Sequence, residues 1–98
     1  MGMKEAYQEK TQARLREWQA RVDVLKARAD KAGAEKKVEY HEQIEALRSK
    51  QEQARQKLEA LQAAGEGAWE DLKAGVDSAL DDLGEAVGKA NDRIRQAS

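Results

Sequence analysis

The chain has 98 residues, of which 18 are Lys or Arg and 19 are Asp or Glu, and it contains no Pro, Cys or Phe. Ala supplies 18 of its hydrophobic residues, whereas Leu, Ile and Val together supply only 15. This composition excludes a thick globular core and a disulfide framework, and it is typical of long helices and coiled coils. We therefore expect one all-α domain over residues 1–98.

The charges are distributed unevenly along the chain. Residues 1–57 carry 14 basic and 10 acidic side chains, whereas residues 58–98 carry 4 basic and 9 acidic ones. One interpretation is that the acidic part packs alongside the basic part within a single fold. The other interpretation is that one end attracts a charged partner.

The first predicted helix covers residues 3–32, where apolar side chains recur in steps of three and four. This seam consists of Leu15, Trp18, Val22, Leu25, Ala29 and Ala32. The spacing is that of the a and d positions of a coiled coil. Basic side chains gather in the last turn before Gly33, which we expect to be the C-cap of this helix.

The second predicted helix covers residues 34–64 and carries a seam of the same kind. Its members are Tyr40, Ile44, Leu47, Ala54, Leu58 and Leu61. Gln51 interrupts the seam with a polar side chain. Charge pairs at helical spacing contribute only about 0.2 to 0.5 kcal/mol each, so packing must hold this helix in place.

The last predicted helix, residues 67–97, carries an internal repeat of 11 residues that starts upstream, at Leu61. Its main column contains Leu61, Leu72, Leu83 and Ile94, and another column contains Val76 and Val87. At about 100° per residue these columns share one helix face, which Trp69 and Leu80 broaden. Each interior glycine costs about 1 kcal/mol relative to Ala, so we expect this helix to depend on docking.

Two architectures fit these segments. If Gly33 and residues 65–67 are turns, the chain forms an antiparallel three-helix bundle. If the helix continues through Gly33, residues 3–64 form a single helix roughly 90 Å long, which the last segment covers only in part. The fold class is therefore all-α, as a three-helix bundle or a coiled-coil helical hairpin with an 11-residue repeat in the last helix.

Few residues offer chemistry. His41 is the only histidine, and Glu45 is the one potential ligand at helical spacing from it, whereas a metal site needs three or four ligands. The glycines at 65 and 67 make too short a loop for phosphate binding and follow no strand. Basic residues are interleaved with acids, so nucleic-acid binding is not expected. We expect no enzymatic activity, no cofactor and no metal.

Several stretches carry a resemblance to known proteins. Residues 15–18, residues 40–47 and above all the Trp-Glu-Asp-Leu-Lys-x-Gly string from Trp69 to Gly75 resemble a group of small bacterial coiled-coil proteins of unassigned function. More loosely, the repeat is similar to those of late-embryogenesis-abundant proteins and exchangeable apolipoproteins. The first resemblance implies a coiled-coil fold, and the second implies a role in stress protection or at a lipid surface.

Our functional hypothesis is a non-enzymatic interaction protein, associated with stress, that acts by self-association or by docking to a protein partner. Its expected interaction seam consists of Leu15, Trp18, Val22, Leu25, Ile44, Leu47, Leu58, Leu61, Trp69, Leu72, Val76, Leu83 and Val87. The alternative is a conditionally folded amphipathic protein that binds or protects membranes through residues 61–98. Without a long apolar stretch or a secretory signal, we expect a cytoplasmic location.

Overall fold

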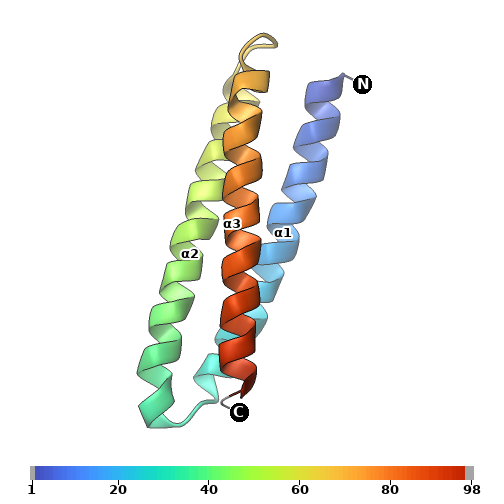
Figure 1. The fold of residues 1–98 in the computed structure, drawn as a ribbon. Coiled ribbons are helices and arrows are strands. Elements are labelled where there is room, and N and C mark those ends of the chain that lie inside the picture. Colours follow the sequence, from blue (N-terminus) through green and yellow to red (C-terminus); the bar gives the residue numbers. More distant parts are fainter. Residues whose placement is uncertain (1, 97–98) are drawn as a thin grey trace.

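A computed structural model describes residues 2–96 and contains three helices: α1 (Met3–Asp30), α2 (Ala34–Ala63) and α3 (Trp69–Gln96). The helices pack against each other as a three-helix bundle with extents of 51 × 19 × 16 Å (Figure 1). Because α2 runs antiparallel to both neighbours, α1 and α3 run parallel (Figure 1). The prediction of an all-α three-helix bundle is confirmed, and residues 3–64 do not form one continuous helix. Residue 97, the expected end of the last helix, lies outside the described residues.

The connection between α1 and α2 differs from the predicted one. The N–H groups of residues 31 and 32 donate to carbonyl oxygens of the last turn of α1, at 3.2 and 3.1 Å. The C-cap of α1 is Lys31, with right-handed backbone, and Gly33 is extended and forms the N-cap of α2. The expectation that Gly33 caps the first helix is therefore wrong. A Cβ atom at position 33 would meet no atom within 4 Å, so neither space nor backbone conformation requires glycine there.

The connection between α2 and α3 is a short turn at the opposite end of the bundle. The carbonyl oxygen of Gly65 accepts hydrogen bonds from the N–H groups of Ala68 and Trp69, at 3.0 and 3.2 Å. Lys4, in the first turn of α1, donates through Nζ to the carbonyl oxygen of Ala64 at 2.6 Å. The exposed carbonyl groups at a helix C-terminus carry partial negative charge, so this cation stabilises the end of α2 and ties it to α1.

This turn divides the 11-residue repeat. Leu61 belongs to α2, and the first copy of the 11-residue repeat then continues through the turn into α3. The prediction that the repeat lies in the last helix therefore holds only for the copies that begin at Leu72 and at Leu83. An 11-residue spacing of apolar residues can continue across a turn, so the spacing alone does not show where the helix is interrupted.

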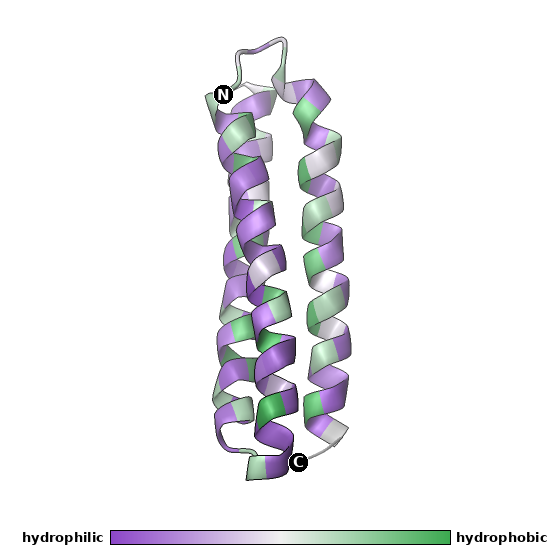
Figure 2. Cartoon of the chain, turned by 90° about the vertical axis from the view of Figure 1, so that its left-hand side faces the viewer, coloured by the Kyte–Doolittle hydropathy of each residue, from purple (hydrophilic) through white to green (hydrophobic). Residues whose placement is uncertain are grey.

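The core lies along the axis of the bundle, where all three helices turn their apolar positions inward. Its buried residues are Leu15, Val22, Leu25 and Ala29 from α1, Tyr40, Ile44, Leu47, Ala54, Leu58 and Leu61 from α2, and Trp69, Val76, Ala79, Leu80, Leu83, Val87, Ala90 and Ile94 from α3. Hydrophilic residues alternate with hydrophobic ones along every helix (Figure 2), and the exposed positions are mainly polar. Removal of this apolar surface from water is what holds the three helices together.

Candidate interaction surface

Most residues of the expected interaction seam are buried within the single chain. Those with buried side chains are Leu15, Val22, Leu25, Ile44, Leu47, Leu58, Leu61, Trp69, Val76, Leu83 and Val87. The bundle thus brings the seams of the three helices together, and they cover one another. The two remaining members, Trp18 and Leu72, are not fully buried.

Leu72 requires a correction, because the repeat predicts it in the middle of a buried face and its side chain is 38% exposed. Ala90 is five helical turns further on and therefore has the same angular position on α3, yet it is only 5% exposed. The angular position on α3 alone therefore does not decide burial. Leu72 lies at an exposed position in the first turn of α3.

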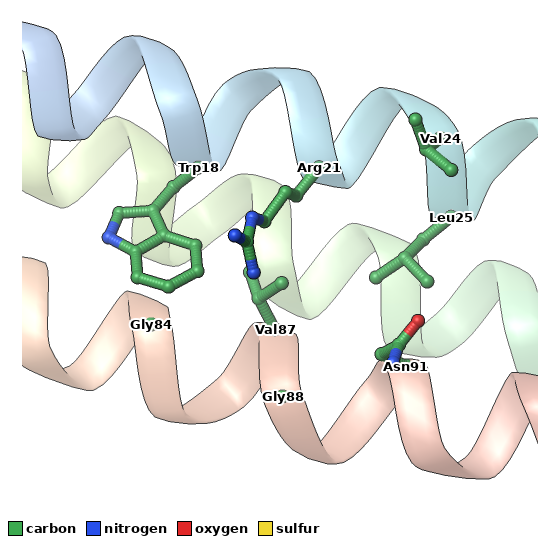
Figure 3. Close-up of a pocket in the computed structure, with 8 residues that line it drawn as sticks. All are labelled: Trp18, Arg21, Val24, Leu25, Gly84, Val87, Gly88 and Asn91. Carbon is green, nitrogen blue, oxygen red and sulfur yellow. The ribbon is translucent and has the colours of Figure 1, made fainter.

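Trp18 is half-buried, and its ring lies against Gly84 of α3. A Cβ atom at position 84 would be 2.7 Å from Cζ2 of Trp18, a separation that real Cβ atoms do not show. Only glycine therefore allows the indole ring to lie against α3 at this point (Figure 3). The glycine that weakens α3 intrinsically is thus required for packing.

Next to this contact lies an open groove between α1 and α3, which we call the α1–α3 groove (Figure 3). Its volume is about 260 Å³, and its lining consists of Trp18, Arg21, Val24, Leu25, Gly84, Val87, Gly88 and Asn91. A Cβ atom at Gly88 would meet no atom within 4 Å, in contrast to Gly84. Val24, at the edge of the groove, is 52% exposed. The groove is therefore an unfilled space bordered by an exposed apolar side chain.

A row of polar side chains at seven-residue spacing lies along α1 and faces α3. Tyr7 donates its hydroxyl hydrogen bond to Oδ1 of Asp77 at 2.6 Å, and Arg14 forms an ion pair with Asp81 at 2.9 Å. Arg28 donates to Oδ1 of Asn91 at 3.3 Å. Residues seven apart return to almost the same angular position on a helix, which explains the alignment. These contacts hold α1 against α3 at both ends of the groove.

Burial and the hydrogen bond to the carboxylate of Asp77 raise the pKa of the Tyr7 hydroxyl above its ordinary value of 10.0. The charged phenolate would lose solvation and would face a negative charge, so the fold favours the neutral phenol. The Tyr7 ring also packs against that of Trp69, with centroids 5.9 Å apart. Tyr7 thus joins the start of α1 to the first three turns of α3.

Arg21 occupies the row between Arg14 and Arg28 but bonds to its own helix. Its guanidinium group pairs with Glu17 at 3.1 Å and lies 5.1 Å from the ring centroid of Trp18. The α3 residues that share the groove with it are two glycines, a valine and an asparagine, with no carboxylate among them. Accordingly, its side chain is 58% exposed, against 33% for Arg14.

The outer flank of α3 along the groove is acidic. Asp81 pairs with Arg14, and Glu85 and Asp92 follow on the same flank at helical spacing. All three residues are exposed, and Glu85 forms an ion pair with Lys89 of its own helix at 3.2 Å. The flanks beside the groove therefore carry arginines on α1 and carboxylates on α3, although only Arg21 among these residues lines the groove itself.

Other polar groups form ion pairs at the surface of the bundle. His41 contacts Asp30 across the α1–α2 turn at 3.3 Å, and Arg55, which pairs with Glu52 and Glu59, holds the pKa of Glu52 below its usual range. Within residues 2–96, no group of three or more His, Cys, Asp or Glu side chains is placed to hold a metal ion. In the same part of the chain, no helix is long and apolar enough to cross a membrane.

Comparisons with family models, with curated proteins and with solved structures return no match for this chain. The resemblance to small bacterial coiled-coil proteins therefore stays a prediction. What the fold and the surface define is an all-α three-helix bundle with a groove between its two parallel helices.

Sequence reasoning missed the polar row of α1, because it searched for apolar residues at heptad spacing. The sequence does contain this row, because Tyr7, Arg14, Arg21 and Arg28 follow one another at intervals of seven residues. It also missed Thr11, which is buried and donates its hydroxyl to the carbonyl oxygen of Tyr7 at 2.9 Å. Thr11 precedes Leu15 by four residues, so the seam already included its position.

Proposed function

We propose that this protein is a non-enzymatic interaction protein and that it binds its protein partner through the α1–α3 groove. The observation that carries the proposal is the groove itself: an unfilled space of about 260 Å³ beside a half-buried Trp18 and an exposed Val24. Tryptophan and arginine are the residues that most often dominate binding energy at protein interfaces. Both line this groove.

The size of the groove favours side chains of a protein over a cofactor or a substrate. Sites for small molecules usually enclose about 300 to 1,000 Å³ and bury most of their ligand. The α1–α3 groove is smaller and is bordered by solvent-exposed residues. One or two apolar side chains of a partner fill such a space and leave the polar rims to form ion pairs.

Photo-cross-linking in the producing cells tests the proposal. A photoreactive amino acid replaces Val24 at the groove, and in the matched control it replaces Ala27, which is exposed one helical turn further along α1. We expect a discrete protein adduct from position 24 and none from position 27. No adduct from position 24, or the same adducts from both positions, contradicts a specific interaction through the groove.

The alternative hypothesis, membrane binding through residues 61–98, requires the bundle to open. The apolar face of α3 packs against α1 and α2, with Leu80, Leu83 and Ile94 almost fully buried. The polar face is mainly acidic, and an anionic membrane repels it. Docking of the closed bundle to a protein requires neither opening of the bundle nor contact with an anionic surface, so we prefer the docking hypothesis.

A further inference from the structure

We propose that the partner at the α1–α3 groove is a second copy of this chain, in a dimer whose two-fold axis runs parallel to the helices. This inference rests on the proposed function and identifies the partner. It starts from the charges on the two sides of the groove. Beside the groove, α1 carries Arg14, Arg21 and Arg28, with Glu17 paired to Arg21. The α3 side carries Asp81, Glu85 and Asp92, with Lys89 paired to Glu85.

The direction of the helices determines which symmetry makes these charges complementary. α1 and α3 run parallel (Figure 1). A two-fold axis parallel to the helices therefore places α1 of one copy opposite α3 of the other at the same height, so arginines face carboxylates. A two-fold axis across the helices, in the plane of the interface, places α1 on α1 and brings arginine against arginine. Like charges disfavour that second arrangement.

Arg21 gains most from the parallel arrangement. Among residues 2–96 its ion pair is with Glu17 of α1, and the opposing part of α3 holds glycines at 84 and 88. In the dimer the acidic flank of the partner's α3 comes to the side of α1 that Arg21 occupies. We expect Arg21 to pair with the partner's Glu85, and Arg28 to pair with the partner's Asp92.

The same symmetry explains the exposed valine and the unfilled space together. Val24 and Gly88 line the same groove, and along the bundle Val24 lies about level with Asn91, beyond Gly88 (Figure 3). An axis parallel to the helices preserves these heights, so Val24 of each copy faces the stretch of the partner's α3 between Gly88 and Asn91. Because no atom lies within 4 Å of a Cβ position at Gly88, the partner's side chain has room to enter.

The available area is sufficient for a stable dimer. A face of the bundle measures 51 by 19 Å. Standard-sized protein interfaces bury about 800 Å² on each partner, which a face of these dimensions can supply. The interface is isologous, because the same groove and the same two rims are contributed by both copies.

Light scattering behind a sizing column, over a range of concentrations, gives the first test. We expect a mass of twice the 10.9 kDa of the chain at the higher concentrations. Arg21→Glu should weaken the dimer by about tenfold, and so should Glu85→Arg, whereas the double variant should regain most of the affinity because the ion pair is restored with reversed charges. Val24→Asp should also prevent dimerisation, and Val38→Asp, on the exposed face of α2, is its matched control.

Cysteine cross-linking tests the direction of the axis, and the chain has no cysteine of its own to interfere. A mixture of Val24→Cys and Gly88→Cys chains should form a mixed disulfide, whereas each variant alone should form little. A disulfide between two Val24→Cys chains overturns the parallel axis. A monomer at every concentration, with no mixed disulfide, overturns the dimer itself.

Failure of this inference and failure of the proposed function give different results. If the protein is monomeric but position 24 cross-links to a different protein in cells, the groove still binds a partner and only the second copy is wrong. If the protein is monomeric and position 24 gives no adduct, both proposals are overturned.

Discussion

The indole ring of Trp18 lies so close to Gly84 that a Cβ atom there would be only 2.7 Å from the ring. Four residues later, Gly88 has no neighbour within 4 Å of the same position. The two glycines belong to one helix and have the same intrinsic effect on it. Packing against Trp18 therefore requires glycine at position 84, whereas nothing around position 88 requires it.

We predict opposite effects for alanine at these two positions. Gly88→Ala should raise the free energy of unfolding by about 0.5 to 1 kcal/mol, because alanine favours the helix and meets no obstacle. Gly84→Ala should lower it, because the added methyl group displaces Trp18. Urea denaturation, followed by the fluorescence of Trp18 and Trp69, measures both. Stabilisation by both substitutions to the same extent would contradict the close contact.

The two tyrosines provide a second matched pair. The hydroxyl of Tyr40 is buried and has no hydrogen-bond partner among the described residues, whereas that of Tyr7 bonds to Asp77. Tyr40→Phe should therefore stabilise the bundle by about 1 kcal/mol, since an unsatisfied polar group is removed. Tyr7→Phe should destabilise it by a similar amount. Thermal denaturation at neutral pH distinguishes these outcomes, and a loss of stability in Tyr40→Phe would indicate that its hydroxyl has a partner.

Stability should also fall at high pH because of Tyr7. Its pKa in the folded protein is raised above the ordinary value of 10.0, so the stabilisation is complete below pH 10 and is lost as the pH rises beyond it. The measurement is the denaturation midpoint as a function of pH. The decline should be smaller in Tyr7→Phe. Equal declines in the two proteins would show that Tyr7 does not cause the effect.

Two leucines in the same column of the repeat should respond differently to aspartate. Leu83 is fully buried and Leu72 is 38% exposed. Leu83→Asp should cost several kcal/mol or prevent folding, because an unpaired charge would be buried in the core. Leu72→Asp should cost about 1 kcal/mol, since its charge reaches water. Circular dichroism during denaturation compares them, and equal losses would show that Leu72 is as well covered as Leu83.

The closed bundle should not bind membranes while it is folded. Its strongest apolar face, on α3, is covered by the other two helices. We therefore expect no change of helix content and no shift of tryptophan fluorescence when vesicles of anionic or neutral lipid are added. A gain of helix on vesicles, or a blue shift of the fluorescence, would favour the alternative function through residues 61–98.

Much of the fold could be predicted from the sequence because helix packing depends on local periodicity. Steps of three and four between apolar residues identified the three helices, and their observed ends differ from the predicted ones by two residues or fewer at the positions that the structure describes. The choice between a turn and a continuous helix at Gly33 could not be made, because the seam stays in phase across it. The choice depends on the packing of all three helices against one another, which involves residues distant in sequence.

The groove was harder to foresee than the core. It depends on Gly88, which looks like every other glycine in the repeat until the position of α1 is known. It also depends on Arg21, which within residues 2–96 pairs with Glu17 of its own helix, whereas Arg14 pairs with Asp81 of α3. Such features arise from the contact between two helices, and neither helix reveals them alone.

The parallel course of α1 and α3 has a mechanical consequence. α1 begins at one end of the bundle and α3 finishes at the other, along the 51 Å dimension (Figure 1). Domains fused to both ends would be held apart by a stiff spacer. A force applied between the ends would act along the helix axes, so the helices would slide past one another and many core contacts would resist together.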